Sequence, residues 1–108
     1  MLAYIELARA EGGMLLAGGH RATAPGRCEG GYFLEPTIFE NLPFDCRVNQ
    51  EEIVDPVVTL TSFDTKKEAL HMAKSTDYGL SAAIWTRDLQ RAHRVAHQLR
   101  TGIVWVNT

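Results

Sequence analysis

The spacing of apolar residues changes within the first 17 positions of the chain. Leu2, Ile5 and Ala8 recur every three residues among charged neighbours, which predicts a short amphipathic helix. Gly12-Gly13 then provides a backbone suited to ending that helix. The apolar run at 14–17 is only four residues long and is followed by two more glycines, so it predicts a buried strand.

Glycine and proline punctuate residues 20–31, which contain few apolar side chains. This composition predicts a surface loop, and it lacks the glycine spacing of a phosphate-binding loop. Residues 32–39 are aromatic and β-branched around Pro36. Because proline cannot donate to a strand ladder, this segment predicts a strand start, an edge strand or two short strands separated by a break.

A strand followed by a helix is predicted in the middle of the chain. The segment 56–63 is rich in the β-branched residues valine and threonine, a composition typical of a strand. Thr65 is followed three residues later by Glu68, which is the pattern of a capping box at the start of a helix. We expect that helix to end between residues 76 and 79.

The last third of the chain predicts strand, helix and strand in turn. Residues 80–86 predict a strand, and the continuous apolar run at 82–85 predicts that it is buried on both faces, with Trp85 and Trp105 filling the core. An apolar stripe runs along a helix between 88 and 102, and 103–106 predicts the last strand. Strands alternating with helices predict an α/β fold, specifically a partial doubly wound sheet of mostly parallel strands joined by crossover helices.

Composition and charge narrow the classes of function. The 108 residues are 45% hydrophobic and 22% charged, as in one ordinary globular domain. Eleven basic and thirteen acidic side chains leave a net charge of -2, so no overall field attracts nucleic acid or an anionic membrane. No apolar run reaches the length of a membrane span, and the first residues do not resemble a leader. We therefore expect a cytoplasmic protein with neither nucleic acid nor membrane as a partner.

The cysteines and histidines do not predict a reactive or metal-binding site. Cys28 and Cys46 lack CxxC spacing and have no neighbouring base, so inert free thiols are expected. His93 and His97 are four residues apart, as in helical zinc sites, but no third ligand accompanies them. With several arginines on the same segment, a solvated basic helix face is the favoured interpretation, and we expect no metal.

Four stretches together resemble the NAD(P)-dependent aldehyde dehydrogenase superfamily, in the C-terminal part of its catalytic domain. They are GYFLEPTIF at 31–39, QEEIVDPV at 50–57, YGLSA at 78–82 and GIVWVN at 102–107. Their order and spacing match the family, and the similarity covers nearly the whole chain. Residues 92–96 with the last stretch are similar to dehydrogenases of muconic-type semialdehydes.

The resemblance implies an enzyme that oxidises an aldehyde to a carboxylic acid. Such enzymes use a cysteine nucleophile, a glutamate general base and NAD or NADP as hydride acceptor. In the family both catalytic residues and the cofactor-binding domain lie upstream of the Glu-Glu-Ile motif, farther than the 51 residues that precede Glu52 here. We therefore expect residues 1–108 to be a partial catalytic domain without a catalytic residue, without a cofactor-binding domain, and unable to bind the cofactor alone.

By position in the motif, Glu52 resembles the glutamate that accepts hydrogen bonds from the nicotinamide ribose. Val54 occupies the position of a family phenylalanine that packs near the nicotinamide, and Asp55 that of a family glycine. Aspartate there costs about 1 kcal/mol or more if the backbone needs a positive φ. Taken without the family, Glu51 and Glu52 are adjacent carboxylates on opposite sides of an extended chain, where solvated surface residues are favoured over an acid–base pair.

Two functions from different classes remain open. The chain is either an inactive piece of an aldehyde dehydrogenase or a non-catalytic binding module that assembles with itself or with a complementary upstream chain. Independent catalysis by Cys28 or Cys46 lacks a base and an oxyanion site. If part of the covering structure is missing, the apolar runs at 80–85 and 103–106 leave sheet surface uncovered, which predicts a homo-oligomer, most simply a twofold dimer.

Overall fold

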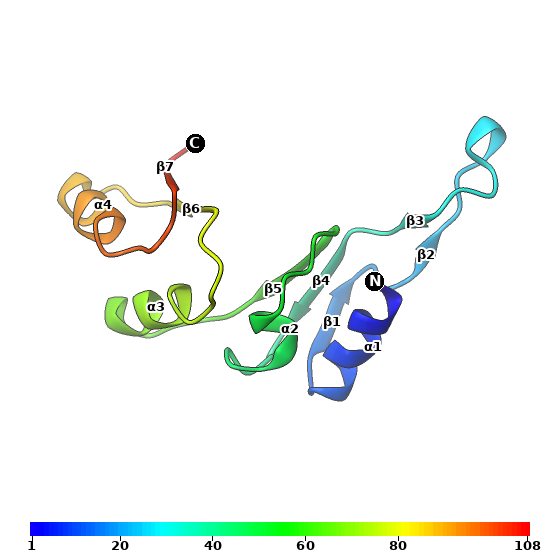
Figure 1. The fold of residues 1–108 in the computed structure, drawn as a ribbon, viewed down its shortest axis with the longest axis horizontal. Coiled ribbons are helices and arrows are strands. Elements are labelled where there is room, and N and C mark those ends of the chain that lie inside the picture. Colours follow the sequence, from blue (N-terminus) through cyan, green and yellow to red (C-terminus); the bar gives the residue numbers. More distant parts are fainter. The chain divides into compact units, whose positions relative to one another are not determined.

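The computed structural model describes all residues 1–108 and divides the chain into two compact units, Met1–Ser62 and Phe63–Thr108. The elements of the N-terminal unit follow one another as helices and short strands (Figure 1): α1 (Leu2–Ala10), β1 (Met14–Ala17), β2 (Arg21–Ala22), the 3-10 turn η1 (Gly26–Cys28), β3 (Phe33–Leu34), β4 (Thr37–Glu40), α2 (Arg47–Gln50) and β5 (Val57–Leu60).

The N-terminal unit is built on a three-stranded mixed sheet in the order β1-β4-β5. Strand β4 lies in the centre, antiparallel to β1 and parallel to β5. The connection between β1 and β4 contains no α-helix but the β2–β3 ribbon, which turns the chain back and favours antiparallel pairing. The connection between β4 and β5 contains α2, as a parallel pair requires.

One face of this sheet carries the core of the unit. Ile5 and Ala8 of α1, Phe39 of β4 and Val48 of α2 are almost completely buried and form one cluster with Leu42. Of the three residues whose spacing predicted α1, Ile5 and Ala8 face the sheet, whereas Leu2 is 50% exposed. Both helices therefore contribute to the same core cluster as Phe39 of the sheet.

Residues 20–31, expected to be a loop without a strand, contain β2, which pairs with β3 in an antiparallel two-stranded ribbon. Arg21 lies over the ring of Tyr32 in this ribbon, 4.8 Å from the ring centre. Pairs this short leave almost no periodic signal in the sequence. Of the three alternatives left open for Pro36, the structure has the break between two short strands, since β3 ends at Leu34 and β4 begins at Thr37.

The C-terminal unit contains two helices and a parallel strand pair: α3 (Lys66–Ala73), β6 (Ser81–Ile84), α4 (Leu89–Ala96) and β7 (Ile103–Val106). The Oγ1 atom of Thr65 accepts the N–H of Glu68 at 3.2 Å, so the predicted cap is confirmed. The Glu68 carboxylate accepts the N–H of Asp64 at 2.9 Å, one residue earlier than in a standard capping box. Helix α3 ends at Ala73, before the predicted 76–79.

The start of α4 and the close approach of β6 to β7 also have local causes. Asp88 caps α4 by accepting the N–H of Arg91 at 2.9 Å. Gly79 lies against the backbone carbonyl of Arg100, and a Cβ at position 79 would collide with that oxygen. Its own carbonyl accepts the N–H of Gly102 at 2.9 Å, immediately before β7. Glycine at this point of the YGLSA stretch therefore allows the two strands to come together.

The α/β class is confirmed, but a doubly wound, mostly parallel sheet is not. The strands form three separate sheets, with two parallel and two antiparallel pairs. Burial of β6 on both faces was also wrong, because Trp85 is 72% exposed and Trp105 is 54% exposed. The physical reason is that α4 packs against β6, while every second residue of β6 and β7 remains exposed, which leaves one face of this pair without cover.

Candidate cofactor-contact site

The QEEIVDPV stretch crosses from the end of α2 to the start of β5. Glu51 caps the C-terminal end of α2, and residues 52–56 form the connecting loop. Ile53 is half-buried and packs against the core, whereas Glu52 and Val54 on either side are exposed. Val54 is 81% exposed. Alternation of this kind is that of an extended segment, so Glu52 and Val54 point to the same side, away from the core.

The two adjacent glutamates have different surroundings. Glu51 accepts a hydrogen bond from the Tyr4 hydroxyl at 2.6 Å and is held by the Arg47 guanidinium at 2.6 and 3.2 Å. The Arg47 and Tyr4 hydrogen bonds lower the pKa of Glu51. Glu52 makes neither a hydrogen bond nor an ion pair with the rest of the chain. Glu51 is therefore occupied within the fold, and Glu52 is the carboxylate that remains available to a ligand.

A second carboxylate fixes the other end of α2. Glu11, which follows α1, accepts the backbone N–H of Arg47 at 3.1 Å and that of Val48 at 3.2 Å. These are two of the N–H groups that a helix start leaves without a partner. The loop that carries Glu52 thus follows a short helix tied to α1 at both ends, by Glu11 and by the Tyr4–Glu51 pair. Sequence analysis missed this arrangement because its partners are 36 and 47 residues apart.

The departures from the family pattern have little effect on the backbone. Among residues other than glycine, only Asn41 and Asn107 have a positive φ, so Asp55 is not strained. The penalty considered for aspartate at this position therefore does not arise in this structure. Val54 presents an apolar side chain on the same side as Glu52, with less area than a phenylalanine would offer.

Neither cysteine is arranged as a nucleophile. Burial raises the pKa of the Cys46 thiol, and the hydrogen bond and charge of Glu11 raise it further. A helix start usually favours a thiolate, and the backbone N–H groups of Asn49 and Val48 do lower the pKa of Cys46, but burial and the Glu11 carboxylate outweigh them. Cys28 is exposed, in the turn η1. The structure contains no cluster of three or more histidine, cysteine or carboxylate side chains that could hold a metal ion. None of its helices is long and apolar enough to span a membrane.

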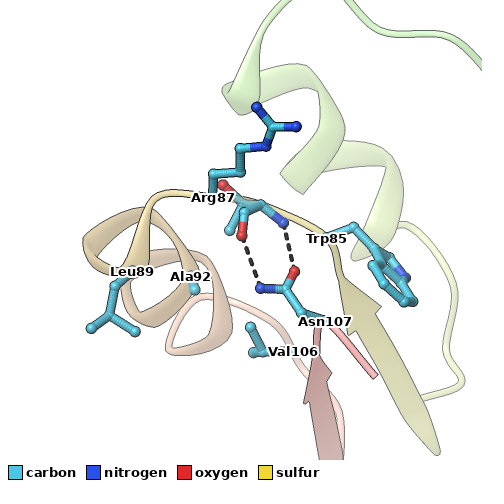
Figure 2. A pocket seen from close by; sticks show the side chains of 7 residues that line it. Trp85, Arg87, Leu89, Ala92, Val106 and Asn107 are labelled. Atoms are coloured by element: carbon cyan, nitrogen blue, oxygen red, sulfur yellow. Dashed lines mark hydrogen bonds between the residues drawn. The ribbon is translucent and has the colours of Figure 1, made fainter.

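An open pocket of about 490 Å³ lies in the C-terminal unit and contains none of the predicted site residues. Figure 2 shows Asn107 among the residues that line it, with two hydrogen bonds from its amide. The Nδ2 atom of Asn107 donates to the carbonyl of Thr86, and its Oδ1 atom accepts the N–H of Thr86, both at 2.9 Å. The remaining lining residues are Trp85, Arg87, Leu89, Ala92 and Val106.

The sequence and the mixed α/β fold of this chain are both similar to those of known proteins. The family model described as aldehyde dehydrogenase family matches residues 1–108. The chain belongs to the aldehyde dehydrogenase family.

Individual relatives have similar sequence identity to this chain, and each match covers nearly all of this chain and about a fifth of the relative. An aldehyde dehydrogenase of Rhodospirillum rubrum is 45% identical over 107 residues, which are 99% of this chain and 21% of that protein. A 2-aminomuconic 6-semialdehyde dehydrogenase of a Pseudomonas species is 46% identical over 108 residues, 100% of this chain and 22% of that protein. The indole-3-acetaldehyde dehydrogenase of P. syringae, solved as a mutant in complex with NAD+ and IAA, is 44% identical with a TM-score of 0.91, covering 99% of this chain and 21% of that one.

The chain spans about a fifth of the length of the relatives it matches. Its expected placement in the C-terminal part of the catalytic domain is corrected: the match runs over residues 1–108, the whole of this chain, and does not assign it to that end of the family. Closeness to muconic-type enzymes is not specific either. A betaine aldehyde dehydrogenase of Bacillus subtilis is 42% identical over 104 residues, similar to the 2-aminomuconic relative.

Proposed function

We propose that this chain is a segment of an NAD(P)-dependent aldehyde dehydrogenase and that its contribution to the cofactor site is the carboxylate of Glu52. The observation that carries the proposal is the contrast between the two glutamates of one motif. Glu51 is held by Tyr4 and Arg47, whereas Glu52 is exposed and unpaired. An ionised carboxylate that accepts hydrogen bonds from two ribose hydroxyls forms a short, charge-assisted contact.

The bound cofactor would accept a hydride from the aldehyde-derived intermediate. The residues of this chain suit a contact with the nicotinamide ribose of such a cofactor, and they offer few contacts to the rest of the molecule. Glu52 offers the acceptor, and Val54 offers an apolar contact on the same side of the loop. Glu11 and Glu51 hold the helix from which that loop starts. None of these residues is a nucleophile or a base for the reacting carbon.

The isolated chain is therefore proposed to be inactive towards aldehydes. Cys46 has a raised pKa and a carboxylate neighbour that disfavours the thiolate, the reverse of what a cysteine nucleophile requires. Catalysis belongs to an assembled enzyme that supplies the nucleophile, the base and the rest of the cofactor site. A semialdehyde of the muconic type is one substrate to test, supported by the 46% identity with the Pseudomonas enzyme.

A chimera tests the role of Glu52. Residues 1–108 replace the matching segment of the Pseudomonas 2-aminomuconic 6-semialdehyde dehydrogenase, and the KM for NAD is measured with its own substrate. Glu52→Gln should raise that KM about tenfold or more, the ratio expected when a hydrogen bond to a charged group is lost. Glu51→Gln, the matched control, should lower thermal stability and leave the KM within about threefold, since this carboxylate is held by Tyr4 and Arg47 and exposed ion pairs contribute little. An active chimera whose KM is unchanged in Glu52→Gln contradicts the proposal.

A further inference from the structure

The helix that precedes Glu52 is a single turn and has no cap of its own. Helix α2 is four residues long, and the side chain of its N-cap residue, Cys46, makes no capping hydrogen bond. Forming one isolated turn of helix is unfavourable, because several backbone angles are fixed for few hydrogen bonds. The conformation of α2, and with it the starting point of the loop, therefore depends on contacts from elsewhere in the chain.

Glu11 supplies the missing cap from the end of α1. Each of its carboxylate oxygens accepts one backbone N–H, Oε1 that of Arg47 at 3.1 Å and Oε2 that of Val48 at 3.2 Å. These are the first two residues of α2. Because the two oxygens are engaged on adjacent N–H groups, the carboxylate fixes the direction of the helix start as well as its position.

The backbone of Glu11 is itself held in place. Its N–H donates to the carbonyl of Leu7 at 2.8 Å, at the end of α1. Helix α1 is anchored by Ile5 and Ala8, which are 1% and 0% exposed, and Val48 of α2 belongs to the same core cluster. Glu11 therefore fixes the start of a one-turn helix relative to an anchored helix of nine residues.

The Tyr4 hydroxyl also connects the two helices, but it does so through a side chain, that of Glu51. The Arg47 guanidinium bonds to the same carboxylate, and this pair lies at the two ends of α2 itself, four residues apart. Bonds between two side chains restrain a backbone less than bonds to its N–H groups do. Glu11, in contrast, bonds to the backbone of α2 directly.

We propose that Glu11 is a positioning residue for the cofactor contact made by Glu52. Glu52 comes four residues after Val48, about one helical turn, so the direction of α2 sets the direction of the Glu52 carboxylate. This inference rests on the proposed function of Glu52. A carboxylate that is already held in its binding direction loses less freedom when the cofactor arrives, and therefore binds it more tightly.

Binding of NAD to the chimera that carries residues 1–108, measured by calorimetry without aldehyde, tests the positioning role. Glu11→Ala should raise the dissociation constant of NAD about threefold to fivefold, the size expected when a side chain must be ordered on binding. Glu11→Gln keeps the side-chain length and one acceptor oxygen, so an increase of about twofold to threefold is expected even if the alanine variant does not fold. Glu6→Ala removes the same charge from an exposed position of α1 and should leave the constant within about 1.5-fold.

The double variant Glu11→Ala/Glu52→Gln, or Glu11→Gln/Glu52→Gln, separates positioning from a general loss of stability. If Glu11 acts through Glu52, its replacement adds less than about 1.5-fold once Glu52→Gln has removed the contact, whereas independent effects multiply. Effects that multiply overturn the positioning role and leave the proposed function intact. The same holds if Glu52→Gln raises the dissociation constant and neither Glu11 variant does. A constant that Glu52→Gln leaves unchanged overturns the proposed function, and the positioning role with it.

Discussion

Replacing Asn107 by alanine should destabilise the C-terminal unit by about 2–3 kcal/mol. The Asn107 amide makes two hydrogen bonds to the backbone of Thr86, both 2.9 Å long. Because they are exposed to water, each contributes about 0.5–1 kcal/mol. Asn107 also has a φ of 54°, a conformation that asparagine tolerates and alanine adopts at a cost of about 1 kcal/mol. The sum of these contributions gives the expected loss.

The loss should spread to the start of α4, since Thr86 belongs to a chain of bonds. The Oγ1 atom of Thr86 accepts the N–H of Asp88 at 3.2 Å, and Asp88 caps the helix. Urea unfolding followed by tryptophan fluorescence is the appropriate assay, because both tryptophans lie in this unit. Asn107→Gly removes the amide without the backbone penalty and should cost about 1 kcal/mol less than alanine. An alanine variant within about 0.5 kcal/mol of the wild type refutes this reasoning, and equal losses in both variants refute the backbone contribution.

Three further outcomes follow from the N-terminal unit. Glu51 has a lowered pKa owing to Arg47, so its stabilising contribution is present above its ordinary value of 4.5 and disappears as pH falls through the lowered one. The stability difference between wild type and Glu51→Gln should therefore be largest near neutral pH and vanish in acid; a difference that grows in acid contradicts the sign. Glu11→Gln should lower the pKa of Cys46, because the Glu11 carboxylate raises it. The pH dependence of Cys46 alkylation, measured in a Cys28→Ser variant, tests this, and an unchanged pH profile argues against Glu11 as a cause. The chain alone should produce no NADH with a panel of aldehydes. NADH production that is abolished by Cys46→Ala would contradict this prediction.

Local patterns predicted the elements whose causes lie within a few residues. The strand at 103–106 and the four-residue strand at 14–17 were predicted with the bounds that the structure has. The caps of both helices in the C-terminal unit follow from Thr65 and Asp88, because a cap needs only a side chain and an N–H three residues away. The paired strands β2 and β3, two residues each, are too short to give a periodic signal.

The features that the sequence did not predict depend on distant partners. Nothing near Glu11 indicates that it caps a helix 36 residues away, and nothing near Tyr4 indicates its bond to Glu51. An apolar run such as 80–85 predicts burial only where a neighbouring element exists to cover it, and here one face has none. For the candidate site, the motif identified Glu52, but only the hydrogen bonds of Glu51 show which of the two adjacent carboxylates is available to a ligand.

The central claim is that this chain carries one cofactor contact and not a complete cofactor site. Calorimetric titration of NAD into the chain tests it most directly. A single hydrogen bond to a charged group contributes about 1.5–3 kcal/mol. Association itself costs about 4–15 kcal/mol, so this one contact is too weak to hold the cofactor. The predicted result is no saturable heat at NAD concentrations up to about 1 mM, for wild type and Glu52→Gln alike. Saturable micromolar binding that is lost in Glu52→Gln and kept in Glu51→Gln would contradict the account, because it would show that the 108 residues form a cofactor site by themselves.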